Sequence, residues 1–200
     1  MALQLNDVLQ IGKRYHNSKR PYLLVNPLQA KHMPVSPAVA LGMMECLGRR
    51  MREKAGGSRA LVVAFAETAT AIGAEAARSL GPDTLFIQTT REILPGEQAL
   101  EFEEEHSHAV EQRLYLPQTA DWLEGVDTLI FVDDELTSGK TMLNILHVLK
   151  QRYPLTGKRL LAASVINRMD GEELARFGEA GLEPVCLFPI PKEDYSCPFY

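Results

Sequence analysis

The sequence is poor in cysteine and tryptophan and has no long apolar run. Its three cysteines, Cys46, Cys186 and Cys197, are odd in number and lack Cys-x-x-Cys spacing, so neither a disulfide framework nor a zinc site is indicated. Such thiols are typical of a reducing compartment. No stretch approaches the roughly 18 apolar residues of a membrane span, and residues 1–17 lack the apolar centre of a signal peptide. We therefore expect a cytoplasmic protein with no membrane partner.

Positive charge is also scarce. The chain has 21 Lys and Arg against 26 Asp and Glu, a formal net charge of −5, which argues against broad contact with a nucleic-acid backbone. Its 200 residues, 46% hydrophobic and 24% charged, are ample for one core and short for two full domains. We expect a single domain over residues 1–200 and no nucleic-acid partner.

What the chain does have is a strong motif between residues 129 and 141. The apolar run 129–132 predicts a buried strand that ends at two adjacent carboxylates, Asp133 and Asp134. A short polar loop follows, and then residues 142–150 predict a helix. A strand, a small loop and a helix in this order turn loop amides and the positive helix end toward an anion. Gly139 would let the backbone approach that anion closely.

Two alternatives to a phosphate site must be considered. The run 139–141, Gly-Lys-Thr, ends like a nucleotide-binding P-loop, but that motif needs a glycine five residues before Gly139. Asp134 occupies this position, and its carboxylate would repel phosphates. The second alternative is a buried strand followed by an ordinary capped helix. An acidic pair alone would suit it, whereas the complete ordered pattern favours the phosphate site.

The motif resembles the phosphoribosyl-pyrophosphate signature of the type I phosphoribosyltransferases. The matching residues are Asp133, Asp134, Thr137, Ser138, Gly139 and Thr141. The resemblance covers most of residues 20–190 and implies an α/β fold, namely a mainly parallel, doubly wound sheet with a small hood or flap contributed by the termini. It also implies a pentosyltransferase that moves the 5-phosphoribosyl group from phosphoribosyl pyrophosphate to a nitrogenous acceptor and releases pyrophosphate.

The resemblance also assigns roles to residues. Asp133 and Asp134 would hold the ribose hydroxyls and, indirectly, a magnesium ion. The loop and helix start would bind the 5′-phosphate; the candidates are Glu135, Thr137, Ser138, Gly139, Lys140 and Thr141. No protein nucleophile is needed, because holding two reactants together can remove about 7–11 kcal/mol of barrier.

A second strand-loop-helix unit precedes the motif, with a predicted strand at 60–65 and a predicted helix at 71–80. In the resembled family the loop at this place holds pyrophosphate through backbone amides, which makes candidates of Glu67, Thr68, Ala69 and Thr70. A plain helix capped by Thr70 is the alternative. A further strand, 84–89, precedes Arg91, where the family often places a basic residue close to the pyrophosphate; a surface ion pair is the alternative there.

The remaining pattern completes an alternation of strands and helices. Strands are predicted at 22–25, 160–166 and 182–188, with short helices at 5–11 and 171–177 and a long one from 37 to 55. Ser36 is the expected cap of the long helix and Asp170 that of helix 171–177. The carboxyl ends of parallel strands meet at one sheet edge. The loops 67–70, 90–91, 133–141 and 167–170 should therefore gather there.

Residues 92–113 depart from the resembled family, which places a mobile loop here. Six glutamates and no lysine or arginine lie between Glu92 and Glu105, which suggests a cationic or amine-bearing acceptor. A metal cluster of Glu104, Glu105, His106 and His108 and a merely solvated loop are the alternatives. The tail 189–200, rich in proline and aromatics, would serve as the flap or be a loose terminus.

The runs 65–73, 89–92 and 105–108 are similar to a narrower branch, the orotate-like phosphoribosyltransferases encoded beside bacterial tellurite-resistance and stress-response genes. That branch is thought to make a nucleoside-like compound. A non-catalytic sensor of phosphoribosyl pyrophosphate and the reverse reaction, base release from a nucleotide, stay open as alternatives. Many relatives are dimers, so the resemblance also allows a homodimer.

Overall fold

The computed structural model describes residues 3–16, 22–31, 33–103 and 112–192. Its elements in chain order are α1 (Leu5–Val8), β1 (Gln10–Lys13), β2 (Tyr22–Val25), the 3-10 helix η1 (Pro27–Gln29), α2 (Pro37–Ala55), β3 (Ala60–Ala64), α3 (Thr70–Leu80), β4 (Leu85–Gln88), β5 (Ala99–Phe102), β6 (Gln112–Tyr115), the 3-10 helix η2 (Asp121–Leu123), β7 (Thr128–Leu136), α4 (Lys140–Arg152), β8 (Arg159–Asn167), α5 (Gly171–Ala180) and β9 (Leu182–Pro189).

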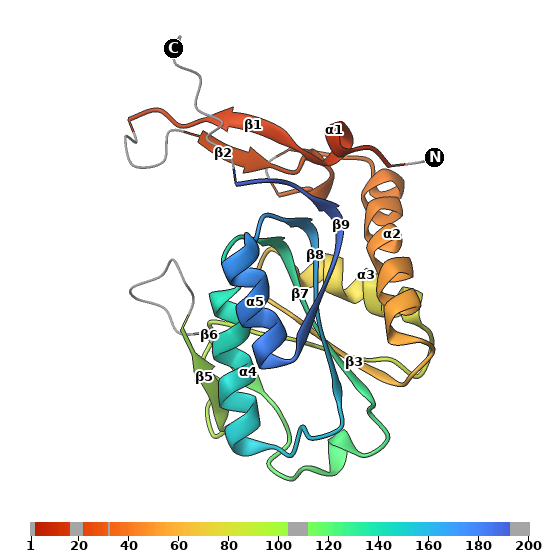
Figure 1. The fold of residues 1–200 in the computed structure, drawn as a ribbon, viewed down its shortest axis with the longest axis vertical. Coiled ribbons are helices and arrows are strands. Elements are labelled where there is room, and N and C mark those ends of the chain that lie inside the picture. The colour runs from red at the N-terminus through yellow and green to blue at the C-terminus, as the bar shows by residue number, and fades with distance from the viewer. Residues whose placement is uncertain (1–2, 17–21, 32, 104–111, 193–200) are drawn as a thin grey trace.

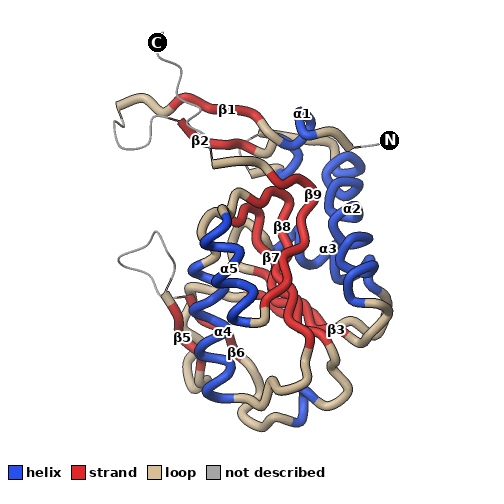
Figure 2. Tube along the Cα trace, in the orientation of Figure 1, coloured by secondary structure: helices blue, strands red, loops and turns tan. Residues whose placement is uncertain are grey.

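A five-stranded parallel sheet forms the centre of the molecule (Figures 1 and 2). Its strand order is β4-β3-β7-β8-β9, and every neighbouring pair is parallel. The sheet therefore begins at β3, to which the chain adds β4 on one side and then β7, β8 and β9 on the other. Helices α3, α4 and α5 make three of these crossovers, and the segment with β5, β6 and η2 makes the connection from β4 to β7. The predicted fold class, a doubly wound α/β sheet, is confirmed.

Two apolar cores hold helices against the two faces of the sheet (Figure 1). Successive residues of a strand point to opposite faces. Val62 and Ile130 accordingly pack into the core beneath α2 and α3, whereas Leu61 and Leu129 pack beneath α4 and α5. Burial on both faces explains why the central strands are continuous apolar runs in the sequence.

The ends of the helices agree in part with those predicted from the sequence. Helix α2 begins at Pro37 as predicted, but Ser36 caps it through its backbone carbonyl rather than its side chain, accepting from the N–H groups of residues 39 and 40. Val39 of this helix is 45% exposed. In α5 the predicted Asp170 cap is confirmed, while the predicted break at Gly178 is wrong, because the helix continues to Ala180 and ends at Gly181 in the left-handed conformation.

Two antiparallel ribbons accompany the sheet. Strand β1 pairs with β2, where the sequence suggested a helix over residues 5–11; only α1 is helical there. This β1–β2 ribbon lies beyond the end of the sheet toward which β9 runs (Figure 1). Strand β5 pairs with β6 inside the segment expected to be a loop, 92–113. The metal cluster at 104–108, considered above as an alternative, and most of the tail 189–200 lie outside the described residues.

Among the described residues, no helix has the length and apolar character needed to span a bilayer. Cys46 and Cys186 are free thiols. Burial raises the pKa of the Cys186 thiol, against the opposing charge of Arg50.

Candidate active site

The acidic pair lies on β7 itself, not after its end. Strand β7 continues to Leu136, four residues beyond the predicted end at Val132, because β8 is equally long and supplies partners: Asp133 is opposite Ser164 and Glu135 opposite Ile166. Asp133 and Asp134 are half-buried. Successive side chains of a strand alternate, so the two carboxylates leave the strand in opposite directions and do not form a simple side-by-side pair.

Asp134 is the meeting point of three distant segments. Its Oδ2 accepts a hydrogen bond from Gln29 Nε2 at 2.9 Å, and its Oδ1 accepts one from Thr68 Oγ1 at 3.2 Å. Gln29 Nε2 also donates to the backbone carbonyl of Thr68 at 3.0 Å. The structure thus brings together the predicted residues Asp134 and Thr68, and adds Gln29, which the sequence did not single out.

Gln29 is held by a short hydrogen-bonded turn. It is the last residue of η1, whose cap Asn26 accepts from the N–H of Leu28 at 2.9 Å and donates to Met43 Sδ at 3.2 Å. Ala30 then leaves the turn in the left-handed conformation. The Asn26-Pro27 dipeptide signalled a turn in the sequence, but nothing local indicated that the turn would carry a side chain to Asp134.

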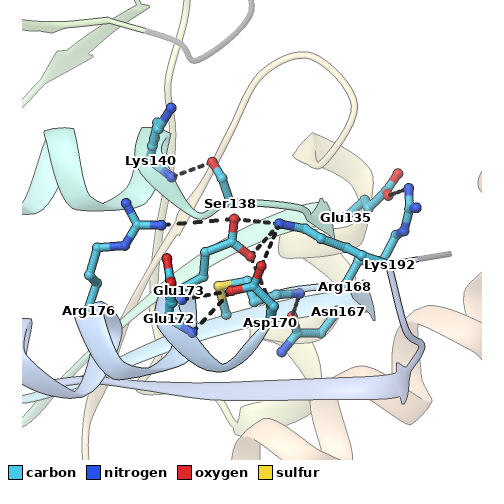
Figure 3. Close-up of polar contacts among 11 residues, drawn as sticks. Glu135, Ser138, Lys140, Asn167, Arg168, Asp170, Glu172, Glu173, Arg176 and Lys192 are labelled. Atoms are coloured by element: carbon cyan, nitrogen blue, oxygen red, sulfur yellow. Dashed lines mark hydrogen bonds and ion pairs between the residues drawn. The ribbon is translucent and has the colours of Figure 1, made fainter. Parts of the chain in front are cut away.

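The neighbours of Asp134 have other partners. Asp133 Oδ1 accepts from the N–H of Asp134 at 2.8 Å. Glu135 forms an ion pair with Arg168 at 3.3 Å, and the Arg168 N–H donates to the Leu136 carbonyl at 2.7 Å. Glu135, a predicted phosphate-loop residue, therefore ties the end of β7 to the loop after β8 (Figure 3).

The loop after β7 is shaped by close packing. Gly139 caps α4 with φ of 69°, and a Cβ built there would lie 2.1 Å from Phe177 Cε2 and 3.1 Å from Met169 Sδ. Glycine is therefore required by the backbone and by the side chains of Phe177 in α5 and Met169 before it, in addition to any close approach by a ligand. Ser138 Oγ accepts from the Lys140 N–H at 3.2 Å (Figure 3), and α4 begins at Lys140, two residues before the predicted start.

The residues of this loop differ in how far they are exposed to solvent. Ser138 and Gly139 are buried, Thr137 and Thr141 are half-buried, and Lys140 is exposed. The loop lies at the positive end of the 13-residue helix α4. A buried, fixed turn before a helix N-terminus suits the phosphate-binding role that the motif predicts.

The loop after β3 is held in place by side chains from other segments. The buried Ala66 N–H donates to Thr89 Oγ1 at 2.8 Å, and Gln112 Nε2 donates to the Ala66 carbonyl at 2.9 Å. The Ala66–Glu67 peptide bond is cis. Glu67 is exposed, Ala69 is buried and Thr70 is half-buried. The alternative prediction of Thr70 as the cap of α3 is wrong: Ala69 is the cap and Thr70 the first helical residue.

The family of the chain can be decided at this point. The family model described as "Phosphoribosyl transferase" matches residues 8–184, most of the chain, from β1 through α5 and into the start of β9. The chain belongs to the phosphoribosyl transferase family. It is a pentosyltransferase, and the reaction of the family is transfer of the phosphoribosyl group from phosphoribosyl pyrophosphate to a nitrogenous base. A comparison with curated proteins gave no match.

Solved adenine phosphoribosyltransferases share the fold. The enzyme from Leishmania donovani superimposes with a TM-score of 0.66 at 12% identity, covering 97% of this chain and 85% of that one. The Trypanosoma brucei enzyme, solved with AMP, pyrophosphate and ribose 5-phosphate, gives 0.62 at 13% identity, with coverages of 96% and 80%. The Saccharomyces cerevisiae enzyme gives 0.61 at 12%, with 92% and 96%. At such identities the likeness establishes the fold alone.

Arg91 is placed differently from Asp134 in this phosphoribosyl transferase. It follows β4 and is exposed, and its backbone carbonyl accepts from Arg113 Nη1 at 3.1 Å. Arg113 in turn forms an ion pair with Glu101 at 3.0 Å and a backbone bridge with Thr90. Arg91 thus lies beside β6 of the β5–β6 hairpin, and its role toward pyrophosphate stays a prediction.

The loop after β8 connects the site to the end of the described chain. Lys192 Nζ contacts both carboxylate oxygens of Glu173 at 2.5 Å and Asp170 Oδ2 at 3.5 Å (Figure 3). The Glu173 N–H bonded to Asp170, aided by the charge of Lys192, lowers the pKa of Asp170. Burial acts to lower the pKa of Lys192, but hydrogen bonds and charges of Glu173 and Asp170 raise it overall. These contacts fix the chain after β9 beside the start of α5.

Proposed function

We propose that this phosphoribosyl transferase binds magnesium phosphoribosyl pyrophosphate at the carboxyl edge of its sheet, with the ribose at Asp133 and Asp134. The observation that carries the proposal is the convergence on Asp134 of the loop after β3, through Thr68, and the turn at Gln29. A carboxylate has about four acceptor positions. Asp134 therefore keeps acceptor capacity for ribose hydroxyls while both of its oxygens are bonded.

Each loop has its own part in the proposal. Residues 137–141, at the start of α4, would hold the 5′-phosphate with amides and hydroxyls. Residues 67–70, braced by Thr89 and Gln112, would hold the pyrophosphate. Arg91 would approach the pyrophosphate from beside β6, since a guanidinium binds phosphate oxygens in a bidentate way. Catalysis would rest on positioning and electrostatics, with no covalent enzyme intermediate.

The carboxylates fit magnesium carried by the substrate. The described residues contain no group of three or more His, Cys, Asp or Glu that could hold a metal by themselves. Magnesium is usually bound by one or two carboxylates together with substrate phosphates, and the hard oxygens of Asp133 and Asp134 suit that arrangement. Bound there, the ion would neutralise charge on the leaving pyrophosphate.

The acceptor belongs to the proposal as well. The acidic composition of residues 92–105 supports an acceptor that is cationic or carries an amine. The similarity of residues 65–73 to the tellurite-resistance branch supports a nucleoside-like product in a bacterial stress response. A single catalytic unit over residues 1–200, a homodimer and a cytoplasmic location complete the proposal; the free thiols of Cys46 and Cys186 are consistent with a reducing compartment.

Calorimetric titration with phosphoribosyl pyrophosphate and Mg²⁺, beside adenosine triphosphate and Mg²⁺, tests the proposal. We expect micromolar binding of the first ligand and none of the second at matched concentration. Pyrophosphate release with adenine and with amine-bearing heterocycles then identifies the acceptor. Binding without release for any acceptor would favour the alternative, a non-catalytic sensor. A folded protein that binds neither ligand would overturn both functions.

A further inference from the structure

Gln29 is a polar side chain in the site that neither the motif nor the matched family description assigns. It reaches Asp134 from a turn 105 residues away in the sequence and Thr68 from 39 residues away. A single amide nitrogen thereby joins the strand of the acidic pair to the loop after β3. The first question is what this bond does for the carboxylate.

The bond determines where the Asp134 carboxylate points. Gln29 donates to Oδ2 and Thr68 to Oδ1, so the two oxygens are held from two sides by neutral donors. The backbone N–H of Asp134 in turn donates to Asp133 Oδ1. A freely rotating carboxylate would present its oxygens to a ribose in many orientations, whereas this one is fixed before the substrate arrives.

The turn that carries Gln29 is built to resist movement. Asn26 is buried, caps η1 and contacts Met43 of α2. Met43 is itself 1% exposed and lies in the core beneath α2 and α3. Gln29 is therefore supported by the main core, not by the exposed β1–β2 ribbon that precedes it.

We infer that Gln29 is a positioning residue, which holds the Asp134 carboxylate in its ribose-binding orientation and keeps the loop at Thr68 at a fixed spacing from it. The inference rests on the proposed function, because it assumes that the ribose binds at Asp134. Gln29 acts through Asp134 and does not itself need to touch the substrate. Hydrogen bonds to charged groups are worth more than neutral ones, so the loss of this bond should be measurable in binding.

Three variants separate positioning from a structural role. Gln29→Leu keeps the size and removes the donor, and Gln29→Glu keeps the shape and places a second carboxylate against Asp134. Gln10→Leu, at an exposed position on β1, is the matched control. We expect Gln29→Leu to weaken binding of magnesium phosphoribosyl pyrophosphate about 10- to 100-fold. Gln29→Glu should weaken it further, and Gln10→Leu by less than about twofold.

A double-mutant cycle with Asp134→Asn gives the decisive readout. If Gln29 acts through Asp134, Gln29→Leu should cost less than about threefold in the Asp134→Asn background. An equal loss in both backgrounds, or a fall in melting temperature that accounts for the lost binding, would make the role structural and overturn the inference. Where Asp134→Asn binds too weakly to titrate, the ranking of the two Gln29 variants decides, and equal losses overturn it. Wild-type protein that fails to bind overturns the proposed function as well, which keeps the two failures distinct.

Discussion

The loops 65–70 and 137–141 are of one kind, each joining a buried parallel strand to a helix, yet they are held in opposite ways. The loop after β7 takes its shape from its own residues, Gly139 in the left-handed conformation and Ser138 bonded to the next turn, packed against Phe177 of the following helix α5. The loop after β3 takes its shape from distant side chains, namely Thr89, Gln112 and Gln29. The two loops therefore differ in whether the residues that determine their conformation are local or distant in the sequence.

A loop determined by its own residues leaves a motif, and a loop determined by distant residues does not. Only a glycine fits the close approach at position 139, so the pattern around it is specific. Residues 66–69 need only fit into the space that the side chains of other segments leave for this loop. This contrast explains why one loop was identified by its sequence and the other by its position.

The largest effect should come from the acidic residues of the β7 unit. Asp133→Asn with Asp134→Asn removes both negative charges proposed to face ribose and magnesium, so we expect phosphoribosyl transfer to fall by about 10³-fold or more. Both side chains are half-buried at the sheet edge, away from the two cores, so the fold should be retained. Pyrophosphate release measures the loss, and circular dichroism and melting temperature check the fold.

Asp127→Asn is the matched control for this double variant. Asp127 is exposed just before the other end of the same strand, where its backbone groups bond Arg59 and Arg159. This variant should keep full activity. A folded double variant that still transfers the phosphoribosyl group would remove the acidic pair from the mechanism.

The same contrast accounts for what the sequence could predict elsewhere. The central strands and the Asp170 cap rest on local patterns, and they were predicted apart from their ends. The end of β7 was wrong because pairing with β8 extends it. Strand β2 was predicted at 22–25, but β1 and β5 were missed because short strands with exposed residues, such as Ile11 at 55%, lack a clear alternation. Gln29 was missed because its partners are remote in the chain.

A change at Gly139 should disturb the β7 loop from within. Gly139→Ala meets Phe177 at 2.1 Å and takes a left-handed backbone conformation. Strain and overpacking together should lower the free energy of unfolding by about 2–5 kcal/mol. Urea denaturation measures the loss. Phosphoribosyl pyrophosphate binding should weaken in the fraction that stays folded.

The Gly157→Ala variant separates the cost of backbone strain from the cost of overpacking. Gly157 also has a positive φ, 78°, but nothing lies within 4 Å of a Cβ built there. This variant should lose about 1 kcal/mol from strain alone. Equal losses for the two glycines would mean that Phe177 and Met169 yield without cost, and that packing does not determine the β7 loop.

A change outside the β3 loop should disturb it from a distance. Thr89→Val keeps the shape of the side chain but leaves the buried Ala66 N–H without its acceptor. We expect a loss of about 1–3 kcal/mol in unfolding free energy. Binding of magnesium pyrophosphate should be weakened several-fold. Denaturation and calorimetry measure the two effects.

Thr128→Val is the control for the Thr89 variant. Thr128 is also buried, but its hydroxyl bonds Ser58 at 2.7 Å at the amino end of β7. It should lose stability and keep pyrophosphate affinity. If Thr89→Val and Thr128→Val bind pyrophosphate equally well, the β3 loop does not depend on Thr89, and the contrast between the two loops weakens.

The smallest effect is expected at the cap of helix α5, which supports the β7 loop from behind. Phe177, which packs on Gly139, is carried by α5, and Asp170 caps that helix. The bonded N–H of Glu173, with the charge of Lys192, holds the pKa of Asp170 below its ordinary value of 3.8. A lowered pKa means that the charged form stabilises the fold above that value, and that this contribution is lost as the pH falls through the folded-state value.

Asp170→Asn keeps a capping oxygen and cannot ionise, so it isolates the charge. Wild-type protein should melt a few degrees above the variant near pH 6, by about 1–4 °C, and the difference should shrink as the pH falls from about 5 to 3. Asp127→Asn provides the baseline for an exposed aspartate outside a helix cap. A difference that stays constant over this range would show that the cap acts through hydrogen bonds alone. The support that α5 gives the β7 loop would then be independent of the charge on Asp170.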